Sequence, residues 1–342
     1  MTIIPVSIVG RKIERLENEI ETLTFKGLGL KEEAIEEFIR TNIDSLFGDE
    51  QSLLIVGQQV RNKEGGRCDL VAIDAGGNLV LIEIKRDYGD IRSRKEAPEF
   101  QAIRYAANFA GIKTPDDLVN KLFAPYIEKH PSEFSGTELT ETEKAKRKLS
   151  EFLSSYNAEK SFNLKQRIVL IASAFDAQTL SACAWLCDNG LDICCFQVHP
   201  VKLKNQLMLH IVKILPPPNI EDYYVDVEPA MRGQKLTDTG QAKGSHSRMG
   251  QLFACGIVKK GDILAIRNFP GSEAVVVDPY YVRFDGKKVK YNKWGQSVTG
   301  WSSIGIYALA VHLKRGKTLD ELRKEILDDM GGKAARQQIE DD

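Results

Sequence analysis

Three charged residues lie at the ends of two neighbouring apolar segments. Asp69 opens the first segment, and Glu83 and Lys85 close the second. Because side chains two apart along a strand share a face, Glu83 and Lys85 are predicted on one side, with Ile84 turned into the core. Two carboxylates and the backbone carbonyl of Ile84 form a hard oxygen donor set suited to Mg²⁺ or Mn²⁺. Such an ion would polarise a phosphate ester and activate a water, while Lys85 stabilises developing negative charge.

A purely structural role is the alternative for the same residues. Glu83 and Lys85 can form an ion pair near a strand end, and an Asp followed by Glu-x-Lys occurs often by chance. The order of the surrounding elements favours the catalytic interpretation. A helix, a strand and a turn precede the strand led by Asp69, and a Gly-Gly-Asn turn, the strand that ends at Lys85 and a further helix follow it.

Hydrophobic periodicity predicts the elements that position these residues. The predicted helices cover 31–47, 98–110, most of 115–155 and 176–189. The predicted strands cover 52–60, 69–73, 79–85, 167–173 and 191–198. Strands that are apolar on both faces and alternate with helices indicate a sheet covered on both sides, and hence an α/β fold.

A break in this pattern predicts two domains. Three prolines at 216–218 and an acidic, turn-rich stretch indicate a linker over 216–247, between a first domain at 1–215 and a small α+β domain at 248–342. In the second domain we expect short strands, a helix at 304–313 and a last helix capped by Thr318 and running to Leu327. Residues 248–317 hold 12 lysines and arginines against 4 aspartates and glutamates, although the whole chain carries −1. Such an asymmetry fits a phosphate-binding module beside a carboxylate-bearing one.

Composition excludes several classes of protein. The chain has 342 residues, 42% of them hydrophobic and 28% charged, which is ordinary globular usage and fits neither a disordered nor a fibrous protein. There is no apolar run long enough for a membrane span and no signal-peptide pattern, so we expect a cytoplasmic protein with no membrane partner. The six cysteines are expected to be reduced. Four of them, Cys183, Cys187, Cys194 and Cys195, suggest zinc ligands, but their apolar helix and strand favour buried thiols.

The sequence blocks around these residues resemble the PD-(D/E)XK nuclease superfamily. The resemblance covers 30–47, 66–74, 77–86 and 101–107, and is strongest to the branch of mismatch and single-strand endonucleases and restriction-like proteins. It implies a restriction-endonuclease-like mixed sheet flanked by helices. It also implies Mg²⁺-dependent (or Mn²⁺-dependent) hydrolysis of DNA, with Asp69 and Glu83 holding the metal and Lys85 catalytic.

The resemblance assigns roles to further residues. Gln101 and Tyr105 match the QxxxY element, which implies that Gln101 lies beside the active site and Tyr105 contacts DNA; residues four apart share a helical face. A helix-borne carboxylate often completes the metal site in this superfamily. Glu32 lies about 60° from the centre of its helix's buried stripe and Glu36 about 100°, so Glu32 is the candidate. A solvated charge favoured by the helix dipole is the alternative for Glu32. The remaining candidates, for binding phosphate, are Arg86 and Arg104.

The second domain interleaves aromatic and basic residues. Lys293, Trp294 and Trp301 are candidates for DNA binding, because indoles stack on bases and lysines follow phosphates. The alternative is that the tryptophans form the core of a small domain. The region 282–323 resembles the restriction-enzyme adenine-methylase-associated modules appended to restriction nucleases, although the usual Ser-x-Ala-Ala motif is absent.

These observations predict a DNA endonuclease that acts in restriction of, or defence against, foreign or modified DNA. One alternative is a repair nuclease acting on mismatched or branched DNA. Another is a catalytically silent nuclease fold that only binds DNA. The presence of the full set of candidate residues argues against this alternative: Asp69, Glu83, Lys85 and Gln101. Cutting of both strands by a domain with one site would require a homodimer.

Overall fold

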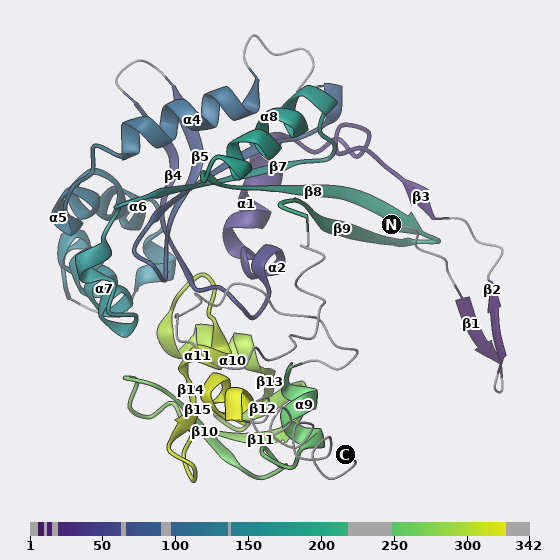
Figure 1. Ribbon diagram of the computed structural model, residues 1–342, viewed down its shortest axis with the longest axis vertical. Helices are drawn as coiled ribbons and strands as arrows, with labels where there is room; N and C mark the ends of the chain where they lie inside the picture. The colour runs from purple at the N-terminus through teal and green to yellow at the C-terminus, as the bar shows by residue number, and fades with distance from the viewer. Residues whose placement is uncertain are drawn as a thin grey trace, which may run out of the picture. The chain divides into compact units, whose positions relative to one another are not determined.

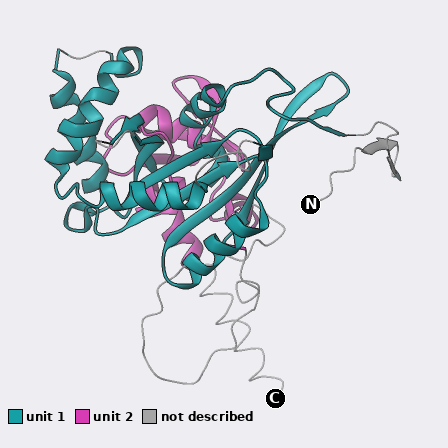
Figure 2. Ribbon diagram, turned by 90° about the horizontal axis from the view of Figure 1, so that it is seen from above, with its two compact units in different colours: residues 1–216 teal, residues 217–342 magenta. Residues whose placement is uncertain are grey.

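The computed structural model describes residues 6–9, 12–15, 20–62, 66–89, 97–135, 138–217 and 248–325. It divides into two compact units, Met1–Pro216 and Pro217–Asp342, coloured separately in Figure 2. Apart from its first two residues, the predicted linker 216–247 lies outside the described residues.

The described part of the first unit contains a seven-stranded mixed sheet in the order β3-β8-β7-β6-β5-β4, with β9 paired to β8. Its strands are β3 (Glu21–Thr22), β4 (Leu53–Arg61), β5 (Arg67–Asp74), β6 (Leu79–Lys85), β7 (Gln166–Ala172), β8 (Asp192–Leu203) and β9 (Gln206–Leu215). β4, β5 and β6 are antiparallel, whereas β6, β7 and β8 are parallel. A separate hairpin joins β1 (Val6–Val9) to β2 (Lys12–Arg15). The predicted mixed α/β class is confirmed.

Helices cover both faces of the sheet, with α4 and α8 above it and α1 and α2 below it in Figure 1. They are α1 (Glu32–Thr41), α2 (Asp44–Phe47), α4 (Pro98–Phe109) and α8 (Ala177–Asp188). The single helix predicted over 31–47 is wrong in one respect, because it is interrupted at Asn42. The Asn42 side chain donates to the Phe38 carbonyl at 3.0 Å, which gives the backbone an alternative to helical hydrogen bonding.

The residues between α4 and β7 form a helical layer against β4. Its elements are α5 (Pro115–Leu118), a π-helical turn (Val119–Phe123), α6 (Ala124–Lys129), a 3₁₀ turn (Pro131–Phe134), α7 (Glu141–Ser155) and a 3₁₀ turn (Glu159–Ser161). The mostly helical excursion predicted at 115–155 is therefore present. In α7, Thr140 and Glu143 form a reciprocal capping box that satisfies backbone N–H groups at the helix start.

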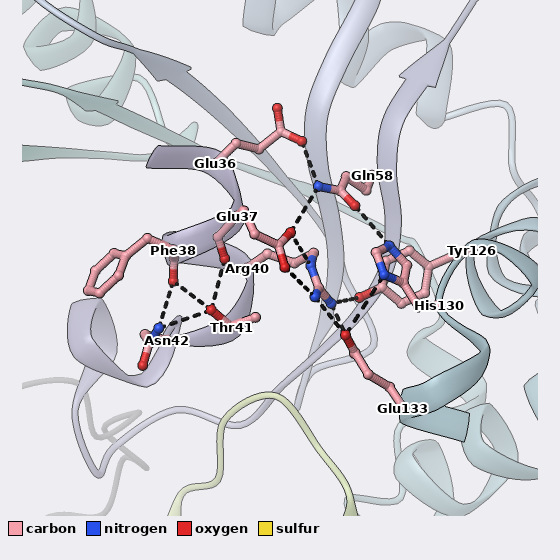
Figure 3. A network of polar contacts seen from close by, with 10 residues as sticks. All are labelled: Glu36, Glu37, Phe38, Arg40, Thr41, Asn42, Gln58, Tyr126, His130 and Glu133. Atoms are coloured by element: carbon pink, nitrogen blue, oxygen red, sulfur yellow. Dashed lines mark hydrogen bonds and ion pairs between the residues drawn. The ribbon is translucent and has the colours of Figure 1, made fainter. Parts of the chain in front are cut away.

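The buried side chain of Arg40 attaches this layer to α1 (Figure 3). Its guanidinium donates to the carboxylates of Glu37 and Glu133 and, at 2.8 Å, to the Tyr126 hydroxyl. Alongside it, His130 Nε2 lies 2.8 Å from Gln58 Oε1 on β4. The network joins α1, β4 and α6, so that the helical layer has a fixed place beside the sheet.

The β5–β6 turn, residues 74–78, is stabilised by hydrogen bonds within the turn and by close packing against Ala158. The Asp74 carboxylate accepts from the N–H groups of Gly76 and Asn78, each at 2.9 Å. Gly77 has a φ of +80° and lies so close to Ala158 that an added Cβ would be 2.9 Å from the Ala158 carbonyl oxygen. Glycine is required here both by conformation and by space. The turn sets a register in which Leu70 pairs with Ile82.

The described part of the second unit contains a six-stranded antiparallel sheet in the order β13-β12-β11-β10-β14-β15. Its strands are β10 (Ile263–Ile266), β11 (Ala274–Asp278), β12 (Tyr281–Phe284), β13 (Lys287–Lys290), β14 (Ala310–His312) and β15 (Lys317–Thr318). Its helices include α9 (Arg248–Ala254), α10 (Tyr291–Thr299) and α11 (Ile306–Leu309). This sheet with its helices is the predicted small α+β fold.

Two predictions for the second unit have different outcomes. The helix predicted at 304–313 is wrong, since α11 ends at Leu309 and 310–312 pair with β10. The central Val311 is β-branched and suits a strand better than a helix. Thr318 does cap a helix: its hydroxyl accepts from the Glu321 N–H at 3.2 Å, and the Glu321 carboxylate accepts from the Thr318 N–H. That helix runs over 319–325, and its predicted end at Leu327 lies outside the described residues.

The cysteines, all in the described part of the chain, are free thiols, and Cys183, Cys194 and Cys195 are buried. Burial raises the pKa of the Cys187 thiol, which favours its neutral form. Among the described residues, no helix combines the length and apolar character needed to cross a bilayer.

We expect Arg40→Met to lower the free energy of unfolding by about 1–3 kcal/mol, because it removes a buried guanidinium on which three oxygen-bearing groups converge. Urea unfolding followed by circular dichroism would measure this. The matched control is Lys146→Met, which breaks an exposed pair with Asp116 at 2.9 Å and should change stability by less than about 0.5 kcal/mol. Equal effects of the two substitutions would contradict the structural role given to Arg40.

Candidate active site

The end of the β5–β6 hairpin brings together the three residues predicted from spacing. Asp69, Glu83 and Lys85 are each no more than 3% exposed. The Ile84 N–H donates to Asp69 Oδ2 at 2.8 Å, and the Lys85 ammonium pairs with the Glu83 carboxylate. Because Leu70 pairs with Ile82, the register places Asp69 next to Glu83 at the end of the ladder. Two carboxylates and one ammonium therefore share a buried site.

These side chains open onto a cavity of about 330 Å³, here called the hairpin-end cavity. Residues from α1, β5, β6 and α4 line it: Glu32, Gly66, Arg67, Asp69, Glu83, Lys85, Gln101 and Tyr105. The structure thus gathers the predicted helix-borne carboxylate and the predicted Gln101–Tyr105 pair around the hairpin.

Tyr105 connects α4 to the start of β5. Its hydroxyl accepts from the Arg67 N–H at 2.7 Å and from the Gln101 side-chain amide at 3.1 Å. An added Cβ on Gly66 would lie 2.8 Å from the Tyr105 ring, so the absence of a side chain there allows this close approach. Gln101 and Tyr105 share a helical face, as their spacing predicted.

A buried cluster behind Asp69 was not predicted from the sequence. The Gln59 backbone has a φ of +54°, which is unusual for a residue with a side chain, and lies between two residues that pair with Leu70 and Cys68. Gln59 is therefore opposite Asp69. Its amide donates to Glu36, which is 2% exposed and also accepts from Gln58 at 2.9 Å. The only signal in the sequence was the position of Glu36 at the edge of the buried stripe.

The site carries a concentration of negative charge. Burial raises the pKa of Asp69; Lys85 and the Ile84 N–H oppose that rise, and Glu32 adds to it. Burial also raises the pKa of Glu36, with a further contribution from the Asp69 charge. Both shifts show that ionised carboxylates are disfavoured here without additional positive charge.

The oxygen donors fit a divalent cation of the Mg²⁺ type. Among the described residues, no three His, Cys, Asp or Glu side chains are grouped as a complete metal site. Mg²⁺, however, commonly uses only one or two protein carboxylates and keeps several waters. Asp69, Glu83 and the Ile84 carbonyl are suitable ligands by chemistry, and Glu32 lines the same cavity. Positive charge from such an ion would offset the carboxylate burial.

The two arginines predicted to bind phosphate lie outside the hairpin-end cavity. Arg86 is partly buried, with its Nε 3.6 Å from Asp87 and its guanidinium 3.4 Å from the Leu30 carbonyl. Asp87 in turn accepts from the N–H groups of Phe25 and Lys26. Arg86 therefore helps to hold the segment before α1, whereas Arg104 is exposed on α4.

The two tryptophans proposed for DNA binding are buried in the second unit. Trp294 is fully buried and donates from Nε1 to the Ser272 carbonyl at 2.9 Å, and Trp301 is 3% exposed and packs edge-to-face on Phe269. Neither indole has a face available for stacking on a base, so the core alternative applies to both. Lys293 is exposed on α10, and its contact with phosphate stays a prediction.

Comparison with protein-family models, with curated proteins and with solved structures found no match to this chain.

We expect Glu36→Gln to gain stability relative to the wild type as the pH rises from about 5 to about 8. The folded-state pKa of Glu36 lies above the ordinary value of 4.5, so ionisation at higher pH destabilises the wild-type fold and not the variant. Urea unfolding of both proteins across this pH range would measure the difference.

Glu37→Gln on the same helix is the control. Arg40 lowers the pKa of Glu37, so its stabilising effect is already complete above the ordinary glutamate pKa of 4.5. The difference between Glu37→Gln and the wild type should therefore stay nearly constant between about pH 5 and pH 8. A flat profile for Glu36→Gln as well would contradict the raised Glu36 pKa.

Proposed function

We propose that this protein is a metal-dependent deoxyribonuclease that hydrolyses phosphodiester bonds. The observation that carries the proposal is the convergence of Asp69, Glu83, Lys85, Gln101 and Tyr105 on one cavity at the end of a hairpin. Carboxylates that can hold a divalent cation, beside a lysine that can stabilise developing negative charge, suit metal-assisted hydrolysis of a phosphate ester. All five side chains already line this cavity in the folded chain.

Each side chain has a distinct part in the proposed mechanism. Asp69 and Glu83, with the Ile84 carbonyl, would hold Mg²⁺ or Mn²⁺, which when bound supplies charge stabilisation and a more acidic water. The Lys85 ammonium, kept in place by Glu83, stabilises negative charge that develops on the phosphate oxygens. The Gln101 amide and the Tyr105 hydroxyl orient the DNA backbone at the rim. Exclusion of bulk water from the buried carboxylates strengthens these electrostatic effects.

Restriction of, or defence against, foreign or modified DNA is the role we favour, with the second unit placing the nuclease unit on DNA. Exposed basic residues of β12, β13 and α10 support DNA binding: Arg283, Lys287, Lys288, Lys290 and Lys293. Arg283 and Lys288 face each other across the hairpin, and Lys288 also pairs with Asp278 at 2.9 Å. Binding by this unit would therefore depend on phosphate contacts and not on tryptophan stacking.

We expect the purified protein to cut DNA only with Mg²⁺ or Mn²⁺, and we expect Asp69→Asn and Lys85→Met each to slow cutting by about 100-fold or more. Supercoiled, linear, single-stranded, mismatched and modified DNA, each incubated with metal or with EDTA and resolved on gels, would measure activity and separate restriction from repair. Asp116→Asn and Lys146→Met, an exposed pair away from the cavity, should cut like the wild type. DNA binding without cutting under every condition would instead support a silent binding module.

A further inference from the structure

A second and larger cavity adjoins the active site. It measures about 950 Å³ and is here called the lateral cavity. Its walls are residues 57–62 on and after β4, the 108–112 end of α4, and the helical layer from Lys121 to Lys129. Arg67 and Tyr105 line both the lateral and the hairpin-end cavity, so the two spaces meet at these residues. A ligand that occupies the lateral cavity is therefore next to the proposed site of hydrolysis.

The charged side chains that line the lateral cavity are all basic among the described residues. They are Arg61, Arg67, Lys121 and Lys129, each of them exposed. Lys121 also pairs with Asp117 at 2.9 Å, but this carboxylate lies outside the cavity. In a chain whose net charge is −1, such sorting of charge produces a local positive potential that favours an anionic ligand.

Two of these cations are held against each other. Arg61 and Arg67 are direct partners in the antiparallel β4–β5 ladder. Like charges that face each other across a ladder destabilise it. Within the described residues no carboxylate forms an ion pair with either guanidinium, and the charges of Asp69 and Glu36 act on Arg67 from a greater distance. An arrangement that costs stability in the unliganded protein is consistent with a bound phosphate between or beside the two arginines.

The interior of the lateral cavity suits a nucleobase. Phe109, Ile112, Leu122 and Pro125 provide apolar surface, and the Asn108 amide provides a donor and an acceptor. Cavities of this size bind small molecules. A few nucleotides of one strand fit this space. A duplex does not, because it is too wide: its major groove alone is broad enough to hold an α-helix.

We propose that the lateral cavity binds unpaired nucleotides of the substrate strand next to the cleaved bond, with Arg61, Lys121 and Lys129 contacting their phosphates. The inference rests on the proposed nuclease function and gives the helical layer at 115–129 a role as one wall of the substrate path. The Arg40 network fixes that wall relative to α1 and β4. Single-stranded binding then combines a basic rim with apolar surface for the bases.

The test is fluorescence anisotropy in EDTA, where no cutting occurs. The probes are a labelled single-stranded oligodeoxynucleotide, the matching blunt duplex and the same duplex with an unpaired extension; free deoxynucleoside monophosphate serves as competitor. The variants are Arg61→Gln, Lys121→Gln and Lys129→Gln. Arg147→Gln and Lys160→Gln, which are exposed in the same unit and outside both cavities, are the matched controls.

We expect the single strand and the extended duplex to bind more tightly than the blunt duplex. Each cavity variant should weaken single-strand binding and reduce the slope of log affinity against log salt by about 0.7. Arg61→Gln should at the same time leave the unfolding free energy unchanged or raise it, which a purely structural role for Arg61 would not produce. Unaltered single-strand affinity in the Arg61→Gln and Lys121→Gln variants, or competition by free nucleotide with no preference for unpaired DNA, overturns the proposal.

Cleavage assays with Mg²⁺ separate this inference from the proposed function. If the protein cuts DNA but the cavity variants leave its single-strand affinity unchanged, the proposed nuclease function stands and the lateral cavity is not a binding site for the strand. A protein that binds single strands through Arg61, Lys121 and Lys129 but cuts no substrate supports the lateral cavity and overturns the nuclease.

Discussion

The pairing of β5 with β6 is the constraint on which the proposed active site depends. It places two carboxylates and an ammonium at one buried end, where Asp69 accepts the Ile84 N–H at 2.8 Å. A shift of one residue in this register would turn Asp69 to the opposite face of the sheet from its present neighbours. The Asp74 turn and the fully buried β6 both oppose such a shift. The proposed chemistry of the site therefore depends on the alignment of β5 with β6.

Around the hairpin, the helices supply what the two strands lack. α1 contributes Glu32 and Glu36, α4 contributes Gln101 and Tyr105, and the helical layer closes a second cavity beside them. Arg40 joins these parts because a buried guanidinium needs several acceptors, and the acceptors lie on different elements. The same interaction that stabilises the packing therefore also determines the distance between the two walls of the lateral cavity.

Sequence patterns predicted β4 to β8 and the helices that flank them, but not β3 or β9 at the edge of the sheet. The grouping of Asp69, Glu83 and Lys85 followed from the spacing alone. The patterns did not predict the left-handed backbone of Gln59, because glutamine has no preference for it and the residue lies in a strand between two residues that pair with β5. Burial of Trp294 and Trp301 was left open, since an aromatic residue in a small domain suits a core as well as a surface. The lateral cavity was also unpredictable, because its cations come from β4, β5, the π-helical turn and α6, which only the tertiary fold brings together.

The turn at the far end of the hairpin has a consequence for how the chain tolerates change. Gly76 accepts from the Ser161 hydroxyl at 2.8 Å and Gly77 from the Asn163 N–H at 2.7 Å, while Ala158 fills the space above Gly77. Hairpin tips are commonly the places where proteins accept insertions. Here the tip contacts residues 158–163. The hairpin that carries Asp69, Glu83 and Lys85 is short in sequence, but to transplant, lengthen or permute it would also require changes in residues 158–163.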